Sequence, residues 1–259
     1  MKFENVNVYN FENAFRGMRN PMNSWDLSDS VFGIKKLDDD CGADVALAWA
    51  KATDRSLVAD FVTEKDLAFD YTVWLWKNGI LAENEDLNIA TVAFIGPKDM
   101  KLAQNLIKSG SEHRKFLRQI FVTVDITAPL YWWKEFDTYK IGTVANSCST
   151  MHKIAAKEFE LDDFSHEHID GMYVEDCMKM VVDYLNAARE FYLSSKDKKF
   201  WWQLIQLLPS SYNQKRTITM NYETVISIIK QRTNHKLDEW NDLVKIFMTL
   251  PYVEDILRE

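Results

Sequence analysis

The sequence predicts an α+β protein, in which several helices pack around a few strands scattered along the chain. Residues 119–127 alternate between apolar and mostly polar side chains, which is typical of a half-buried strand. Residues 174–194 repeat apolar side chains at the i, i+3, i+4 spacing of an amphipathic helix. Eight glycines and five prolines in 259 residues provide few breaks, and no internal repeat or Gly/Ser linker divides the chain. We therefore predict one domain that covers residues 1–259.

The N-terminal part is expected to begin with an edge strand over residues 3–10. Arg16 and Arg19 follow it, three positions apart and therefore on one face if this segment is helical. Such a pair can grip a phosphate, although a solvated helix end is the alternative. We also expect helices over residues 42–53 and 64–78, a solvated acidic loop at residues 38–40, a buried strand over residues 89–95, and a helix over residues 97–108.

The central strand leads into a segment that combines an aromatic helix with a polar loop. Pro129 fits the first position of a helix that runs to about Asp137. The next residues, KIGTVANSCSTM, are mostly small or hydroxyl-bearing, so we expect a loop whose backbone N–H groups and hydroxyls can hold a phosphate or a ring edge. Further along we expect helices over residues 174–194, 197–208, 222–232 and 238–249, a strand over residues 216–220 in the same sheet, and Asn221 as an N-cap.

Composition and charge narrow the classes of function. A net charge of −8 argues against a broad nucleic-acid surface, although a small anion can still bind in a local pocket. Three cysteines without motif spacing argue against a disulfide framework. The N-terminus does not resemble a signal peptide, and no apolar run approaches the ~18 residues of a membrane span, so we expect a cytoplasmic protein that does not bind membranes. His166 and His168 lie in an acidic loop without a third ligand, and we predict no metal site.

Residues 128–152 resemble a motif of the flavin-dependent thymidylate synthases. Ala128-Pro129 matches the Ala-Pro that opens a helix in that family, and Glu135 stands where the family has Gln. Residues 138–140, Thr-Tyr-Lys, stand at the family's Arg-His-Arg, so only Lys140 keeps its charge. If Ala145 is treated as one extra residue, then residues 146, 147 and 149 align with the Asn-Glu-x-Ser of the family.

The C-terminal part resembles the same family without a gap. Leu208-Pro209, Asn221 and Arg232 keep the family's spacing. Other charged positions are replaced: Met151-His152 stands at an Arg-Tyr pair, and Ile205 stands at a second Arg. The resemblance covers about the last two-thirds of the chain. Each charge-assisted hydrogen bond contributes ~1.5–3 kcal/mol, so the loss of several implies weaker nucleotide binding unless other cations replace them. The cations that we consider as replacements are Lys140, Lys134, Arg118, Lys153, Arg16 and Arg19.

The resemblance implies a central antiparallel sheet with packed helices and a homotetramer that binds FAD and dUMP. It also implies a methyltransferase reaction at C5 of the uracil, with methylenetetrahydrofolate and NADPH as co-substrates and the flavin as hydride donor. Catalysis would then rest on electrostatic activation and positioning, because the family uses no enzymic nucleophile. The residues implied are Arg232 at the pyrimidine base as the catalytic residue, then Lys140, Ser147, Ser149, Thr150 and Glu135 for substrate binding, and Asn221, Tyr139 and Thr138 for the cofactor.

Several alternatives stay open beside this interpretation. The chain can be a non-catalytic relative that binds a nucleotide or a flavin, or a purely structural oligomer. Arg232 can simply be a cation that the helix dipole favours at a C-terminus, and Cys148 is expected to be a small filler rather than a nucleophile. The aromatic pairs Trp132-Trp133 and Trp201-Trp202 exceed what one core needs, so we predict a homo-oligomer, a tetramer if the resemblance holds.

Overall fold

The computed structural model describes residues 1–36 and 89–258, so the helices expected at 42–53 and 64–78 and the acidic loop at 38–40 lie outside the described residues. The chain forms two compact units, and each is described by itself. The first unit comprises Met1–Asn7 and Val122–Met220, and the second comprises Val8–Phe121 and Asn221–Glu259. The single domain over residues 1–259 stays a prediction.

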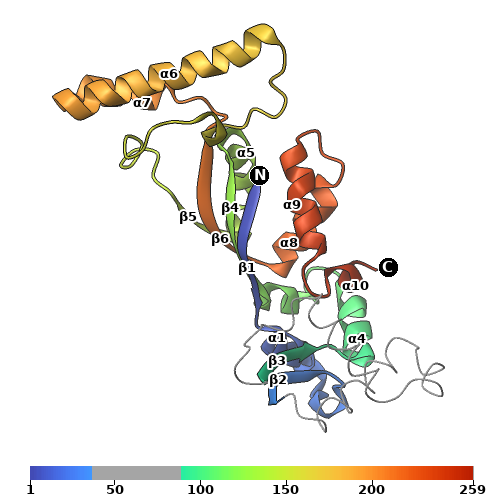
Figure 1. Cartoon of the computed structure of the whole chain (residues 1–259). Helices are drawn as coiled ribbons and strands as arrows, with labels where there is room; N and C mark the ends of the chain where they lie inside the picture. The colour runs from blue at the N-terminus through green and yellow to red at the C-terminus, as the bar shows by residue number, and fades with distance from the viewer. Residues whose placement is uncertain (37–88, 259) are drawn as a thin grey trace. The chain divides into compact units, whose positions relative to one another are not determined.

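A four-stranded antiparallel sheet dominates the first unit and confirms the α+β class. Its strands are β1 (Lys2–Tyr9), β4 (Phe121–Pro129), β5 (Thr143–Ser147) and β6 (Asn213–Asn221), arranged in the order β1-β4-β6-β5 (Figure 1). The expected edge strand near the N-terminus is therefore confirmed as β1, and the segment at 216–220 does lie in the same sheet as the central strand.

The alternation in β4 has the predicted consequence for burial. Val122, Val124 and Ile126 are at most 1% exposed, while Phe121 on the opposite face is 41% exposed. The strand begins at Phe121 because residues 115–119 form a 3-10 helix, η4 (Lys115–Gln119). Pro129 is the last residue of the strand and the N-cap of α5 (Leu130–Phe136), one position before the predicted one. After α5 the chain continues in a second 3-10 helix, η5 (Asp137–Gly142).

The expected polar loop after η5 is partly wrong, because Thr143–Ser147 form the edge strand β5. β5 pairs antiparallel with β6, with Thr143 opposite Met220 and Ser147 opposite Arg216. The neighbouring strand supplies a hydrogen-bonding partner that the short run of small residues could not reveal, and the β-branched Thr143 and Val144 fit a pleated edge. Only the residues after Ser147 keep the character of a loop.

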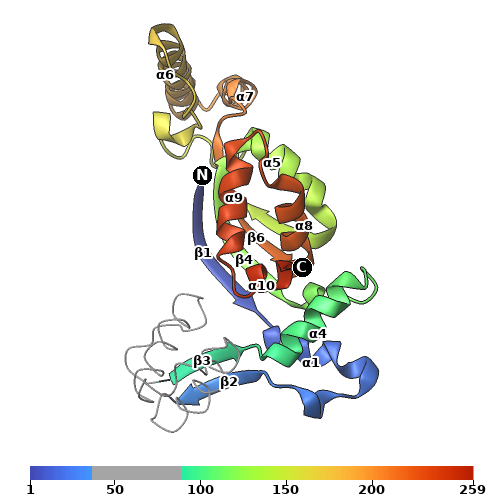
Figure 2. The same cartoon turned by 90° about the vertical axis from the view of Figure 1, so that its right-hand side faces the viewer.

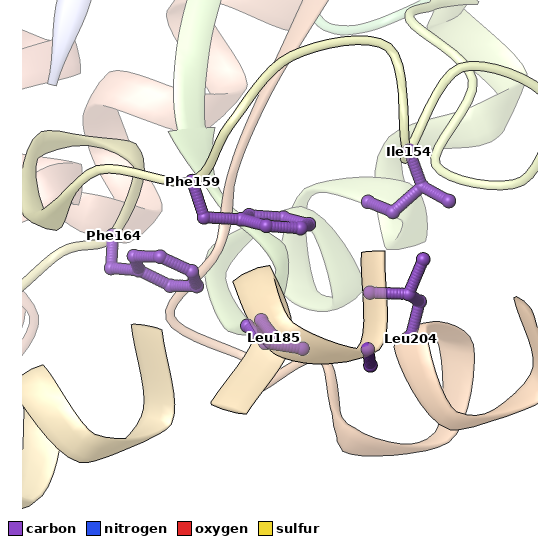
Figure 3. Packing of buried hydrophobic residues seen from close by; sticks show 6 residues of the cluster. Ile154, Phe159, Phe164, Leu185 and Leu204 are labelled. Atoms are coloured by element: carbon purple, nitrogen blue, oxygen red, sulfur yellow. The ribbon is translucent and has the colours of Figure 1, made fainter. Parts of the chain in front are cut away.

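A helical hairpin completes the first unit. α6 (Met172–Ser195) and α7 (Lys198–Leu207) lie side by side, and the Asp197 side chain caps α7 by accepting a hydrogen bond from Lys199 N at 2.9 Å (Figures 1 and 2). Leu185 of α6 and Leu204 of α7 are fully buried beneath side chains from the loop before the hairpin (Figure 3). The buried cluster, labelled in Figure 3 apart from Ala188, is Ile154, Phe159, Phe164, Leu185, Ala188 and Leu204.

Aromatic side chains form the core of the second unit. Phe11 of α1 (Phe11–Met18) packs edge-on against Tyr222 and Tyr252, with ring centroids 5.5 and 5.7 Å away. Tyr222 opens α8 (Tyr222–Arg232), where Asn221 accepts a hydrogen bond from Thr224 N at 3.0 Å and so confirms the predicted cap. The remaining elements are the antiparallel pair β2 (Val31–Lys36) and β3 (Ile89–Phe94), helices α4 (Pro97–Lys108), α9 (Asp238–Met248) and α10 (Val253–Leu257), and the 3-10 turns η1 (Asn20–Met22) and η2 (Trp25–Leu27); a last 3-10 turn, η6 (Leu161–Asp163), belongs to the first unit.

A buried ion pair anchors the start of α4. Arg19 Nε donates to Asp99 Oδ1 at 2.5 Å, and the two side chains are 6% and 1% exposed. The Arg19 Nη groups donate to the carbonyl oxygens of Ser24 and Leu27. Asp99 also accepts from two serine hydroxyls, so this buried charge pair is surrounded by hydrogen-bond partners. Arg19 and the exposed Arg16 therefore do not form the paired phosphate grip that the sequence suggested.

Candidate functional site

The residues at the Arg-His-Arg position follow directly from α5. Trp132, Trp133 and Phe136 are buried and hold the helix against the first unit's interior, which delivers residues 137–142 to the surface. The Thr138 hydroxyl donates to Glu135 O at 2.7 Å and closes the last turn. The rings of Tyr139 and Phe136 lie 6.2 Å apart. Lys140 is exposed and forms no ion pair with any residue that the structure describes, so its ammonium group is available to an anion.

A network centred on Arg216 fixes both ends of this segment. The guanidinium lies 4.3 Å over the Trp133 ring, and its Nη1 donates to Asp137 Oδ1 at 2.9 Å. Its Nε donates to Gln214 Oε1 at 2.9 Å, and Gln214 Nε2 donates to Cys148 O at 2.7 Å. Arg216 and Gln214 thus tie the start of η5 and the end of β5 to the same strand. Sequence reasoning missed both residues, because they belong to a strand 66 or more positions away from the segment that they hold.

The turn at residues 148–152 is the part of the segment that offers hydrogen-bond donors outward. The backbone N–H of Cys148 donates to Lys215 O at 2.9 Å. The Ser149 hydroxyl oxygen accepts hydrogen bonds from the N–H groups of Met151 and His152. Ser149 therefore keeps its own hydroxyl proton for another acceptor. Within the described part of the chain, no residue accepts from the backbone N–H groups of Ser149 or Thr150. Adjacent free N–H groups beside hydroxyls make a concavity that suits an anion.

A small cavity of about 180 Å³ adjoins this turn. It is lined by residues of the turn and its continuation together with Tyr192 of α6 and Trp201 of α7. The Trp201 indole donates to Met151 O at 3.0 Å, which fixes the position of the turn against α7. The cavity is smaller than the ~300–1,000 Å³ of typical ligand sites and matches a single ring or a phosphate group. Its lining residues are Met151, His152, Ile154, Ala155, Tyr192 and Trp201.

Charges on the adjoining sheet are paired with one another. Lys215 contacts Glu4 and Asp125, and these hydrogen bonds raise the pKa of the Lys215 ammonium. Asp125 accepts from Thr217 and Asn5, which lowers the pKa of its carboxyl group. These contacts hold β1, β4 and β6 together, so the charges of this patch are engaged with one another.

Arg232 lies in the second unit, at the last position of α8. Its guanidinium is 4.2 Å above the ring of the buried Trp240, and its Nη1 lies 3.0 Å from His235 Nε2. The ring and the imidazole hold the guanidinium in one place, so it is a positioned and half-buried cation. The position at the end of a helix is the predicted one. Both predicted roles remain compatible with it: a ligand contact and a cation favoured by the helix dipole.

The predicted residues fall into two groups. Glu135, Thr138, Tyr139, Lys140, Ser147, Ser149 and Thr150 belong to the first unit, whereas Asn221 and Arg232 belong to the second. Within the first unit, the structure places Ser147 opposite Arg216 in the sheet and Ser149 in the turn that follows. Asn221 uses its side-chain oxygen to cap α8. The roles assigned to all nine residues stay predictions.

The aromatic pairs, the histidines of the acidic loop and the helices bear on three further kinds of interaction: with another chain, with a metal ion and with a membrane. Trp132 and Trp133 are fully buried within one chain, so they no longer support an oligomer, whereas Trp202 is 46% exposed. The His166 imidazole instead lies 2.8 Å from Phe164 O. Among the described residues, no three His, Cys, Asp or Glu side chains lie close enough to hold a metal ion together. No described helix has the length and apolar character required to cross a membrane.

Comparison with solved structures places this fold. Over 100% of both chains, the structure is similar to thymidylate synthase X (ThyX) from Helicobacter pylori, solved with FAD and dUMP, with a TM-score of 0.57 and 14% identity. A second structure of the same H. pylori enzyme, a flavin-dependent thymidylate synthase complexed with FAD and dUMP, has 16% identity and a TM-score of 0.48 over 89% of this chain and 97% of that one. No protein-family model and no curated protein matches the sequence. The chain therefore has a ThyX-like fold.

Proposed function

We propose that this protein binds a uracil nucleotide, dUMP, and acts as a flavin-dependent thymidylate synthase-type methyltransferase. The observation that carries the proposal is the turn at residues 148–152, which offers unengaged N–H groups and a hydroxyl at the motif position of a ThyX-like fold. A nucleotide monophosphate needs donors for its dianion and a directional donor for its base. Lys140 and the turn would supply the first, and Arg232, of the same chain or of another subunit, would supply the second.

The residues present fit a phosphate group, which dUMP and FAD share. Lys140, Ser147, Ser149 and Thr150 would hold the phosphate, and Arg232 would donate to a carbonyl of the pyrimidine. Glu135 would contact the substrate, and Thr138, Tyr139 and Asn221 would line the cofactor. Bound FAD would supply hydride chemistry, with methylenetetrahydrofolate as carbon donor and NADPH as reductant. The work of this chain is to orient the nucleotide and to stabilise charge that develops on the ring. We place this reaction in a homotetramer in the cytoplasm.

A second candidate, a nucleotide-binding relative without catalysis, is favoured by the replaced charges. Thr138 already bonds within its own helix end, and Ile205 packs against the buried cluster of the helical hairpin. Neither side chain can replace the guanidinium that the family has at its position. Lower affinity for dUMP, or loss of flavin with dUMP retained, would support this candidate.

The test is an absorbance spectrum of the purified protein followed by calorimetric titration with dUMP and with FAD. We expect flavin absorbance and binding of both ligands. Arg232→Ala should weaken dUMP binding about 10- to 100-fold, because a charge-assisted hydrogen bond contributes ~1.5–3 kcal/mol. Arg258→Ala is the matched control, since Arg258 is exposed and pairs only with Asp255 among the described residues. Binding of neither ligand by the wild-type protein would overturn the proposal and leave a structural oligomer.

A further inference from the structure

The helix α6 carries a second apolar stripe that no described part of the chain covers. Tyr173, Cys177, Met180, Tyr184, Ala187 and Phe191 follow one another at spacings of four, three, four, three and four residues, and all are exposed. We call these six residues the α6 seam. The adjacent stripe of the same helix, with Leu185 and Ala188, is buried against α7 and the preceding loop (Figure 3). A core-facing helix needs only that one stripe.

The spacing of the seam is the heptad pattern of helices that pack along each other. Alternating steps of three and four residues keep side chains on one line over about 27 Å of helix, at ~1.5 Å per residue. Tyr173, Met180 and Phe191 are 82%, 68% and 58% exposed, which is a large apolar surface for a water-soluble unit. A groove of about 330 Å³ opens along the same side of α6 toward Leu207 of α7. The seam therefore has both the periodicity and the shape of a helix-docking surface.

We propose that the α6 seam binds the α6 seam of a second copy of this chain, antiparallel, about a two-fold axis that crosses the seam between Met180 and Tyr184. This register makes the seam complementary to itself. Tyr173 lies opposite Phe191 of the other copy, Met180 opposite Tyr184, and Cys177 opposite Ala187. The two smallest side chains, Cys177 and Ala187, thus meet between bulkier pairs, which lets the backbones approach closely at that level. No other antiparallel register of the seam pairs all six residues.

The area of the contact is sufficient for a specific pair. Aromatic side chains bury roughly 150–250 Å² each, so the exposed fractions of the seam correspond to ~500 Å² on each copy. Two copies would bury ~1,000 Å², the threshold for a specific interface. The seam would form one interface of the proposed oligomer, and its pairing does not require nucleotide or flavin binding.

The charges beside the seam should make the pairing of two copies depend on salt. Asp176, Asp183 and Glu190 border one side of it, all exposed, and in the antiparallel register they face the same three acids of the other copy. Among the described side chains, only Lys179 approaches them, 4.0 Å from Asp176. The apolar contact must outweigh this repulsion, which salt screens. Self-association should therefore become stronger as salt is added. A partner with basic residues beside its apolar face would show the opposite dependence, because salt would weaken its attraction to the three acids.

The experiment uses the single cysteine of the seam. In a full-length Cys41→Ser, Cys148→Ser background, Ala187→Cys places a thiol opposite Cys177 of the second copy, within reach of a disulfide. Oxidised glutathione should then produce a covalent dimer on a non-reducing gel. Each protein disulfide forms as two thiols pass two electrons and two protons to one glutathione disulfide, which becomes two molecules of reduced glutathione. Within one helix, residues 177 and 187 lie ~15 Å apart and cannot join. Lys179→Cys, exposed and off the seam, is the matched control and should stay monomeric on the gel.

Light scattering of the unoxidised wild-type protein completes the test. We expect dimers or larger multiples that become at least severalfold tighter from 50 to 500 mM NaCl, and a shift toward monomer in Met180→Asp with unchanged helix content. A disulfide through Cys177 alone, without Ala187→Cys, would indicate a parallel pair and overturn the register. A monomeric wild-type protein at micromolar concentration, or a pair that weakens with salt, would overturn the proposal even if dUMP and FAD bind.

Discussion

Arg19 and the turn at residues 148–152 both present donors of the kind that hold a phosphate, yet the structure uses them differently. Arg19 is 5% exposed, and its guanidinium is occupied by Asp99 and by the carbonyl oxygens of Ser24 and Leu27. The turn is exposed, and the N–H groups of Ser149 and Thr150 have no acceptor among the described residues. A residue's type gives its capacity to donate, whereas the fold decides whether the donor remains available.

The difference separates stability from binding in energetic terms. Breaking a buried ion pair leaves a charge without compensation and costs several kcal/mol, so Arg19 and Asp99 hold their segment firmly. Donors left over at a surface cost little, because water satisfies them until a ligand replaces it. We therefore expect mutations in the two regions to affect different measurements, and the following three predictions run from the largest change in stability to the smallest.

Asp99→Ala should lower the free energy of unfolding by about 3–5 kcal/mol, because Arg19 would stay buried without its partner. Urea denaturation measures this change. Asp242→Ala removes an exposed carboxylate that pairs with Lys245 at 3.1 Å, and as a control it should cost less than about 1 kcal/mol. Nearly equal effects of the two mutations would show that the Arg19 cluster is not the anchor that its burial indicates.

Gln214→Leu should have an intermediate effect, about 1–3 kcal/mol, because it removes the amide that joins Arg216 to Cys148 O. Amide hydrogen exchange at residues 148–152 should also become faster, since the turn loses its attachment to β6. Gln206→Leu, at an exposed position on α7, is the control and should change neither measurement. Unchanged exchange in Gln214→Leu would mean that the Trp201–Met151 hydrogen bond alone fixes the turn.

Local patterns predicted most of the elements but not the sites at which they meet. The alternation at 119–127, the cap at Asn221 and the amphipathic period of α6 each depend on neighbours in sequence, and the structure confirms all three. The strand β5 was missed because its partner, β6, lies about 70 residues later. The burial of Arg19 was missed for the same reason, since Asp99 is 80 positions away. The exposed seam shows the converse: its period was visible in the sequence, but not which stripe the chain would cover.

Of these three mutations, Ser149→Ala should change stability least and dUMP binding most. Its hydroxyl oxygen accepts hydrogen bonds from two backbone N–H groups at an exposed turn, where water can replace it. We therefore expect the free energy of unfolding to fall by at most about 1 kcal/mol. The same change removes a donor to the phosphate and loosens the N–H groups of Met151 and His152, so dUMP affinity should fall about tenfold by titration. Ser149→Thr keeps the hydroxyl and should restore affinity, and Ser194→Ala, which removes an exposed hydroxyl on α6, should leave affinity unchanged. If Ser149→Ala binds dUMP as tightly as the wild-type protein, the leftover donors of the turn do not hold the phosphate, and the contrast with Arg19 loses its functional meaning.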